Sequence, residues 1–112
     1  SLAGTNGRTG SLSESQQVDI IINATPIGME GTQNEDRVPL TLAGMHKNQI
    51  VIDLIYHPLE TAFLSSAREI GTRTMNGIGM LIHQAALQYT LWTQKEAPLD
   101  VMYDTVMRKI SR

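Results

Sequence analysis

The sequence predicts an α/β protein: a partial, Rossmann-like half of a doubly wound parallel sheet, followed by C-terminal helices. Two short and nearly continuous apolar runs, at residues 18–23 and 49–55, are typical of strands buried on both faces of a parallel sheet. Apolar residues at helical spacing then fill residues 59–70, 76–94 and 98–110. Strands that alternate with helices favour parallel pairing, because each helix returns the chain to the same end of the sheet.

The composition of the 112-residue chain limits the classes of function. With 41% hydrophobic residues, the chain can form one small domain with a modest core. Its net charge of −2 and the lack of a basic run argue against nucleic acid or an anionic membrane as a partner. Without cysteine it has no thiolate metal site, and His46, His57 and His83 are not spaced as metal ligands. No apolar run is long enough to cross a bilayer, so we expect a cytoplasmic protein.

The chain begins with a polar segment and a first strand. Residues 1–17 are rich in Ser, Gly, Thr and Gln without an apolar period, which predicts a flexible arm. The strand at residues 18–23 stops at a turn that contains proline and glycine. Residues 30–38 then predict a loop, and residues 39–44 predict a single helical turn.

The second half of the chain carries the clearer helical signals. After the strand at residues 49–55, the pattern predicts an amphipathic helix over residues 59–70, which Gly71 ends. Residues 72–75 form a short third strand that leads into Asn76. Asparagine is a good N-cap, because its side-chain oxygen accepts from a free backbone N–H of the first turn. A long helix therefore begins there.

The first turns of that long helix contain two unusual features. Gly77 and Gly79 are poor helix residues, which indicates that a ligand or another chain segment approaches the backbone closely. Gln84 is an amide among apolar neighbours. It either finds backbone partners within the core or orients a bound group, and both readings remain open.

Polar side chains also stand where the first two strands end. Asn23 and Thr25 follow the first strand, and Tyr56 follows the second. Open α/β sheets bind their ligands at the carboxyl ends of their strands. Tyr56 is therefore expected either to line a pocket or to cover the sheet edge with its hydroxyl bonded internally.

Three motifs together resemble the shikimate dehydrogenase family. They are residues 23–29 (NATPIGM), residues 53–58 (DLIYHP) with Thr61, and residues 76–84 (NGIGMLIHQ). Their combination, order and spacing carry the resemblance, which extends from residue 18 to the end of the chain. It implies that residues 18–112 form the C-terminal half of an NAD(P)-binding Rossmann-like domain, together with its closing helices.

The resemblance also implies roles for individual residues. Tyr56 and Gln84 match positions that bind the substrate in the family. Gly77 matches a glycine whose carbonyl binds the nicotinamide carboxamide in the family. Met80 matches a residue whose side chain packs beside the nicotinamide ring. The positions matched to the cofactor are, in full, Asn23, Ala24, Thr25, Leu54, Gly77 and Met80.

The implied activity is reversible, NADP-dependent reduction of 3-dehydroshikimate to shikimate in aromatic amino-acid biosynthesis. NAD as cofactor and quinate as substrate remain open, because the segment that reads the ribose phosphate has no counterpart here. The family's glycine-rich turn and its catalytic Lys/Asp pair also have no counterpart in this chain. Lys47 and Asp53 do not stand in the sequence motifs that carry that pair. We therefore expect a fragment that is inactive alone and that needs an N-terminal substrate domain.

An alternative reading is a catalytically inert module, either truncated or regulatory. Without the strand that would precede it, the strand at residues 18–23 has one unpaired edge. An apolar strand with a free edge is a template for pairing with another chain. We therefore expect a homo-oligomer, formed by edge pairing or by exchange of the arm at residues 1–17.

Overall fold

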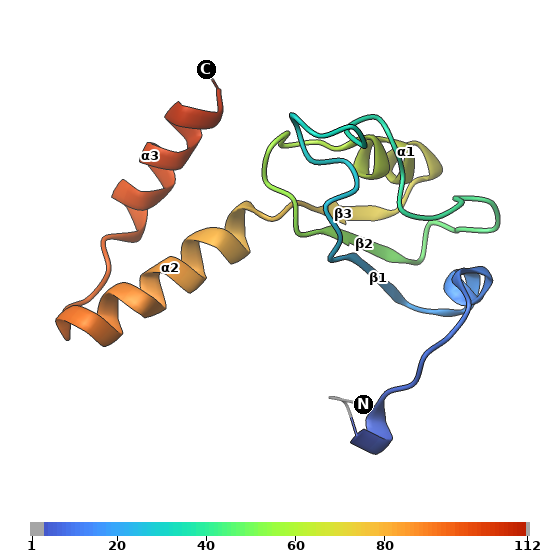
Figure 1. The fold of residues 1–112 in the computed structure, drawn as a ribbon, viewed down its shortest axis with the longest axis horizontal. Coiled ribbons are helices and arrows are strands. Elements are labelled where there is room, and N and C mark those ends of the chain that lie inside the picture. Colours follow the sequence, from blue (N-terminus) through green and yellow to red (C-terminus); the bar gives the residue numbers. More distant parts are fainter. Residues whose placement is uncertain (1–3, 112) are drawn as a thin grey trace.

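A three-stranded parallel sheet forms the centre of the protein (Figure 1), in a computed structural model that describes residues 4–111. Its strands are β1 (Ile20–Asn23), β2 (Ile50–Asp53) and β3 (Arg73–Met75), in the order β1-β2-β3. Since all three run in the same direction, their carboxyl ends lie along one edge of the sheet. The predicted α/β class with a partial parallel sheet is confirmed.

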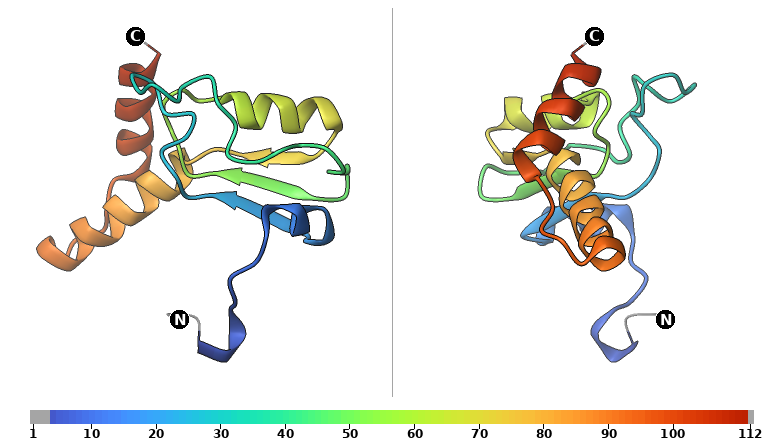
Figure 2. Two further views of the ribbon diagram at one scale, coloured as in Figure 1. Left: turned by 45° about the vertical axis from the view of Figure 1, so that its right-hand side comes forward. Right: turned by 90° about the vertical axis from the view of Figure 1, so that its left-hand side faces the viewer.

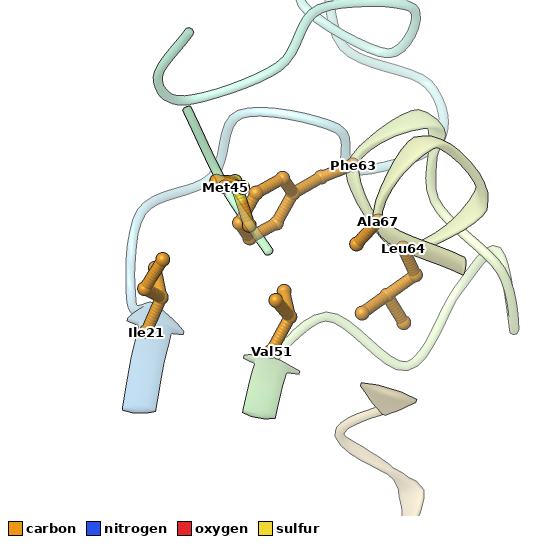
Figure 3. Packing of buried hydrophobic residues seen from close by; sticks show 6 residues of the cluster. All are labelled: Ile21, Met45, Val51, Phe63, Leu64 and Ala67. Carbon is orange, nitrogen blue, oxygen red and sulfur yellow. The ribbon is translucent and has the colours of Figure 1, made fainter. Parts of the chain in front are cut away.

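One face of the sheet is covered by α1 (Ala62–Ile70) and holds the core. Thr61 caps this helix, its side chain accepting from the Leu64 N–H, and Gly71 ends it in the left-handed conformation with φ 97°. The helix thus begins three residues later than the predicted residue 59, because the capping hydroxyl fixes where the helical bonds start. Figure 3 shows the core between the strands and α1, formed by Ile21, Met45, Val51, Phe63, Leu64 and Ala67.

The opposite face of the sheet is open, which corrects the prediction of strands buried on both faces. Ile20 and Ile22 are 50% and 56% exposed, whereas Ile21 between them is buried. Ile22, Ile52 and Met75 are in register on neighbouring strands, and they form an apolar row on this face. The reason is that only one layer of helix covers the sheet, so alternate side chains of each strand lack a covering element.

The N-terminal segment contains two short helical turns that its composition did not predict. Residues Gly4–Asn6 and Leu12–Gln17 form short 3-10 helices, and the second has a capping box between Ser11 and Glu14. Buried Gln49 fastens this segment to the sheet, donating to the carbonyls of Ser15 (2.7 Å) and Val18 (2.8 Å). Flexibility of residues 1–17 stays a prediction, and residues 1–3 of that arm lie outside the described residues.

The predicted helical turn at residues 39–44 is wrong. The segment instead has bends and a single turn, in which the Met45 N–H donates to the Leu42 carbonyl at 3.1 Å. Gly44 takes a left-handed φ of 82°, which a helix does not contain. Leu40 and Leu42 still contribute to the fold, because they pack against the core cluster.

Two C-terminal helices extend from the carboxyl edge of the sheet (Figures 1 and 2). They are α2 (Ile78–Thr93) and α3 (Leu99–Ile110), and α3 turns back toward the start of α2. A buried stripe on α2 consists of Ile78, Ile82 and Ala86. Other apolar side chains of α2 are exposed, among them Leu87, Leu91 and Trp92. A surface helix of a globular protein usually turns its apolar side chains toward the core, so this amount of exposed apolar surface on α2 is unusual.

The shape of the whole chain reflects this incomplete burial. Its radius of gyration is 16.2 Å, against about 13 Å for a compact domain of this length. Its accessible surface is 8136 Å², about 2,000 Å² more than a compact monomer of this mass exposes. Exposed apolar side chains of the open sheet face and of the C-terminal helices contribute to this excess, as does the extended N-terminal segment. Among residues 4–111, no helix is both long and apolar enough to span a membrane.

Candidate functional site

The carboxyl edge of the sheet is organised by three buried polar side chains. Asn23 ends β1, Asp53 ends β2 in register with it, and Thr61 precedes α1. Asp53 and Thr61 are fully buried and Asn23 nearly so. Asp53 Oδ1 accepts from Asn23 Nδ2 at 3.1 Å, and its Oδ2 accepts from the Thr61 hydroxyl at 2.7 Å. We call Asn23, Asp53 and Thr61 the strand-end network.

The loop after β1 is folded around the Asn23 side chain. Asn23 Oδ1 accepts from both the backbone N–H (3.0 Å) and the hydroxyl (2.6 Å) of Thr25, and Asn23 Nδ2 donates to the Ile27 carbonyl at 3.1 Å. Side chains of asparagine often form such turns with the residues that follow. Ala24 and Thr25 are consequently exposed at the edge, while Asn23 itself is occupied by internal bonds.

The segment after β2 lies directly against the start of α2. The Leu54 N–H donates to the Asn23 carbonyl at 3.1 Å, and the Gly77 N–H donates to the Ile55 carbonyl at 2.9 Å. A Cβ added at Gly77 would stand 2.0 Å from the Leu54 carbonyl oxygen. The sequence predicted that either a ligand or another chain segment approaches this glycine closely. The approach of the Leu54 carbonyl is sufficient to require glycine here.

The cap of α2 differs slightly from the prediction. Asn76 does accept from a first-turn amide, that of Ile78, at 3.2 Å, but the N-cap position itself is Gly77. Asn76 Nδ2 also donates to the Leu59 carbonyl at 3.1 Å, which ties the start of α2 to the segment before α1. The second glycine, Gly79, faces α3, since a Cβ added there would lie 3.6 Å from the Tyr103 hydroxyl.

Tyr56 lines a shallow pocket beside the second strand end. The pocket has a volume of about 180 Å³, and its lining residues are Met29, Glu30, Ile55, Tyr56 and His57. Two of these lining side chains are paired, with His57 Nε2 and Glu30 Oε2 2.7 Å apart. Tyr56 is 42% exposed, so of the two readings of this residue the pocket-lining one agrees with its position.

Met80 and Gln84 lie farther out on α2. Met80 is 56% exposed and stands within one turn of Gly77. Gln84 is exposed as well, and its Nε2 donates only to the Leu81 carbonyl, at 3.1 Å. The expectation that Gln84 sits among buried apolar neighbours is wrong for this chain, because the stripe that α2 buries runs through Ile78 and Ile82 instead.

Five of the residues matched to the cofactor therefore converge at one edge: Asn23, Ala24, Thr25, Leu54 and Gly77. Asp53 and Thr61, which hold them together, belong to one of the three motifs, but the sequence alone assigns them no role. The available signal was an acidic residue at the end of an apolar run, where burial requires donors. Within residues 4–111, no three His, Cys, Asp or Glu side chains are grouped so as to hold a metal ion.

Comparison with known proteins points to one family. Residues 77–107 match the family model described as the shikimate 5'-dehydrogenase C-terminal domain. The shikimate dehydrogenase (NADP(+)) of Methanocaldococcus jannaschii is 45% identical over 96 residues, which are 85% of this chain and 33% of that protein. The similarity covers most of this chain but only a third of the relative.

Solved structures agree. A shikimate dehydrogenase crystallised with NADP+ superimposes with a TM-score of 0.81 at 39% identity, covering 90% of this chain and 35% of that one. A quinate dehydrogenase from Corynebacterium glutamicum, solved with NAD, gives a TM-score of 0.77 at 31% identity, covering 87% and 33%. The chain spans about a third of the length of these relatives. It belongs to the shikimate dehydrogenase family, and it corresponds to the C-terminal part of those proteins.

Proposed function

We propose that this chain supplies the nicotinamide side of an NADP-dependent shikimate dehydrogenase. The observation that carries the proposal is the meeting of the motif segments at the carboxyl edge of one parallel sheet, where Gly77 contacts the Leu54–Ile55 backbone. In the reaction, the hydrogen on C3 of shikimate passes as hydride to NADP+ and the C3 hydroxyl loses its proton. The products are 3-dehydroshikimate, NADPH and a proton.

The residues at the edge fit a flat, amide-bearing ring. The Gly77 carbonyl accepts one bond, from the Leu81 N–H at 3.0 Å, and a carbonyl oxygen has a second lone pair for a carboxamide N–H. Ala24, Thr25 and Leu54 offer backbone along the same edge, and Met80 an exposed, adaptable side chain. The cofactor when bound accepts the hydride, and these residues fix its orientation.

In the proposed enzyme, Tyr56 and Gln84 orient the substrate. Both present polar groups to solvent, the tyrosine hydroxyl beside the strand end and the glutamine amide on α2. A hydroxyl-rich substrate is recognised by such groups, since each substrate hydroxyl left without a partner loses a bond that water had supplied. No group in this proposal performs the proton transfer, for which we propose a Lys/Asp pair in the remaining part of the enzyme.

The partner in this proposal is the part of the enzyme that the relatives have beyond the matched third. Its docking surface is the open sheet face together with the exposed apolar side chains of α2. Its large apolar side chains Ile20, Ile22, Met75, Leu87, Leu91 and Trp92 are 50–80% exposed, which supports an interface with an apolar centre. We place residues 18–112 in the cofactor domain and its closing helices, as the motifs indicate.

The test is a hybrid enzyme. Residues 18–111 replace the matching segment of the Methanocaldococcus jannaschii relative, and NADPH formation with shikimate is followed by absorbance. We expect turnover by the hybrid and none by the 112-residue chain alone, because the proton-transfer pair is supplied by the relative. A folded hybrid without turnover, or turnover by the chain alone, contradicts the proposal.

Two variants of the hybrid test the residue roles. Tyr56→Phe and Gln84→Ala should each lower kcat/KM for shikimate by roughly ten- to a hundredfold, which corresponds to about 1–3 kcal/mol for an unpartnered hydroxyl, with little change in the affinity for NADP+. His83→Ala, next to Gln84 and also exposed, is the matched control and should leave both unchanged. Loss of NADP+ affinity with intact substrate kinetics reverses the assignment.

A second candidate is a module that associates through β1. Strand β1 lies at one edge of the sheet and its apolar side chains Ile20 and Ile22 are exposed. Such an edge favours a homo-oligomer. Sedimentation equilibrium at micromolar concentration tests this, and a stable 12.4 kDa monomer contradicts it.

A further inference from the structure

The strand-end network connects the three segments that the proposed function assigns to the nicotinamide. We propose that Asp53 is the positioning residue of this site: its carboxylate fixes the placement of Thr25, the Leu54–Ile55 backbone and Gly77 relative to one another. This inference rests on the proposed function. Asp53 has no exposed surface and both its oxygens accept bonds from the protein, so it acts through these segments without touching a ligand.

The first connection runs from Asp53 to the loop after β1. An asparagine side chain has a donor end and an acceptor end. Asp53 Oδ1 holds the donor end of Asn23 at 3.1 Å, so the acceptor end faces the two donors of Thr25, at 3.0 and 2.6 Å. If the amide turned round, its NH₂ group would face the Thr25 donors. The carboxylate, together with the Ile27 carbonyl that accepts from the same Nδ2 at 3.1 Å, therefore selects the one orientation of Asn23 that folds Ala24 and Thr25 into their observed turn.

The second connection runs from Asp53 to α2. The same Oδ1 accepts from the Ile55 N–H at 3.1 Å, which orients the Leu54–Ile55 peptide. The Ile55 carbonyl in turn accepts from the Gly77 N–H at 2.9 Å. Gly77 lies so close to this peptide that even a Cβ cannot be inserted. A small rotation of the Leu54–Ile55 segment must consequently displace the start of α2, and with it the Gly77 carbonyl.

The third connection anchors the carboxylate itself. Asp53 Oδ2 accepts the hydroxyl proton of Thr61 at 2.7 Å, and Thr61 Oγ1 accepts the Leu64 N–H at 3.3 Å. The hydroxyl thus joins Asp53 to the first turn of α1, which is part of the core. Ligand-contacting groups that are fixed by such supporting hydrogen bonds bind with higher affinity, because they are already in the binding geometry before the ligand arrives.

The experiment uses the full 112-residue chain and its backbone amide NMR signals. In D53N one carboxylate oxygen becomes an NH₂ group, so the network loses an acceptor while keeping its volume. We expect the amide signals of Thr25, Ile55 and Gly77 to shift together, although these residues belong to three separate segments. In the hybrid enzyme, titrated with NADP+, D53N should lower the affinity by about tenfold or more, the size of the effect when an orienting partner behind a metal ligand is lost.

A second pair of variants keeps the test decisive if D53N unfolds. T61V removes the hydroxyl and should reproduce the coupled shifts and the weaker NADP+ response, whereas T61S keeps the hydroxyl and should restore both. Val51→Ala, on the same strand but facing the core, controls for lost stability. It should lower the unfolding midpoint while leaving the signals of Thr25 and Gly77 unchanged.

The outcomes separate this inference from the proposed function. Shifts confined to Ile55, or coupled shifts with an unchanged NADP+ affinity, overturn the positioning role. A wild-type hybrid enzyme without any response to NADP+ contradicts the proposed function, while coupled shifts of Thr25 and Gly77 in D53N and T61V of the 112-residue chain would still support the placement role of Asp53. Equal behaviour of T61S and T61V also overturns the inference.

Discussion

The carboxyl edge of the sheet and its open face are built from the same three strands, and they differ in how completely their groups are partnered. At the edge, Asn23, Asp53 and Thr61 bond to one another and to backbone, and no buried side-chain N or O atom in the described part of the chain lacks a partner. On the open face, Ile22 and Met75 are more than half exposed. The hydrogen bonds of the edge are complete within the described residues, whereas the open face has no covering element among them.

Because of this difference, the two regions respond differently to substitution in the chain alone. Substitutions at the edge disturb contacts that are already made, so their cost appears in the stability of the 112-residue chain. Substitutions on the open face remove no contact here, so their effect appears only when the covering element is present. Matched substitutions can therefore distinguish the two regions.

The largest effect is expected at the start of α2. Gly77→Ala forces a methyl group against the Leu54 carbonyl, 2.0 Å from the added carbon, and should lower the free energy of unfolding by about 3 kcal/mol or more. Gly79→Ala is the matched control. Its added carbon meets nothing nearer than 3.6 Å. Because alanine favours a helix more than glycine does, the free energy of unfolding should stay equal or rise by up to about 1 kcal/mol. Urea unfolding measures both, and an equal loss at the two glycines contradicts the close packing of Gly77.

The second comparison uses neighbouring isoleucines on β1. Ile21→Thr places a hydroxyl in the core and should lower the free energy of unfolding by about 2–4 kcal/mol. Ile22→Thr makes the same chemical change on the open face, where 56% of the residue is already exposed, and should change it by less than about 0.5 kcal/mol. In the hybrid enzyme the Ile22 variant should become costly, since the face is then covered. An equally large loss for Ile22→Thr in the isolated chain would mean that the face is already buried, by a second copy.

The third prediction concerns the hydrogen bonds of the edge. Asn23→Ala removes the partner of both donors of Thr25, and one bond each from the Ile27 carbonyl and the Asp53 carboxylate, and should lower the free energy of unfolding by about 1–3 kcal/mol. Asn34→Ala is a useful control, because that side chain accepts only from exposed Arg37 and should cost little. Thermal unfolding followed by circular dichroism gives the comparison, and equal midpoints for the two variants would contradict the structural role of Asn23.

The smallest effect is local and depends on pH. Arg8, through its side-chain hydrogen bond, and the Ser11 N–H lower the pKa of the exposed Glu14 carboxyl from 4.5 to about 2. Because the folded pKa is the lower one, the capping box is stabilised above pH 4.5 and loses that stabilisation as the pH falls toward 2. A carboxyl ¹³C titration of Glu14 measures this, and Arg8→Gln should raise the pKa. A wild-type titration midpoint near 4.5 contradicts the ion pair.

Much of the fold could be predicted from sequence because it depends on local patterns. The runs of isoleucine and valine predicted β1 and β2, although the paired strands are shorter, four residues each. Helical periodicity predicted α1, α2 and α3 to within a few residues, since caps such as Thr61 and Gly71 act on their immediate neighbours. Polar residues at strand ends likewise predicted that Asn23 and Thr25 lie at the carboxyl edge of the sheet.

Other features were decided by tertiary structure alone. Ile21 and Ile22 are chemically identical, and only the position of α1 determines that the first is buried and the second exposed. Gln84 is exposed because the side of α2 that carries it has no neighbour in the described part of this chain. Asp53 meets Asn23 from thirty residues away, and Gly77 meets Leu54 across the sheet. Periodicity and capping are local properties of the chain, whereas burial and hydrogen-bond partners depend on which distant segments the fold brings together.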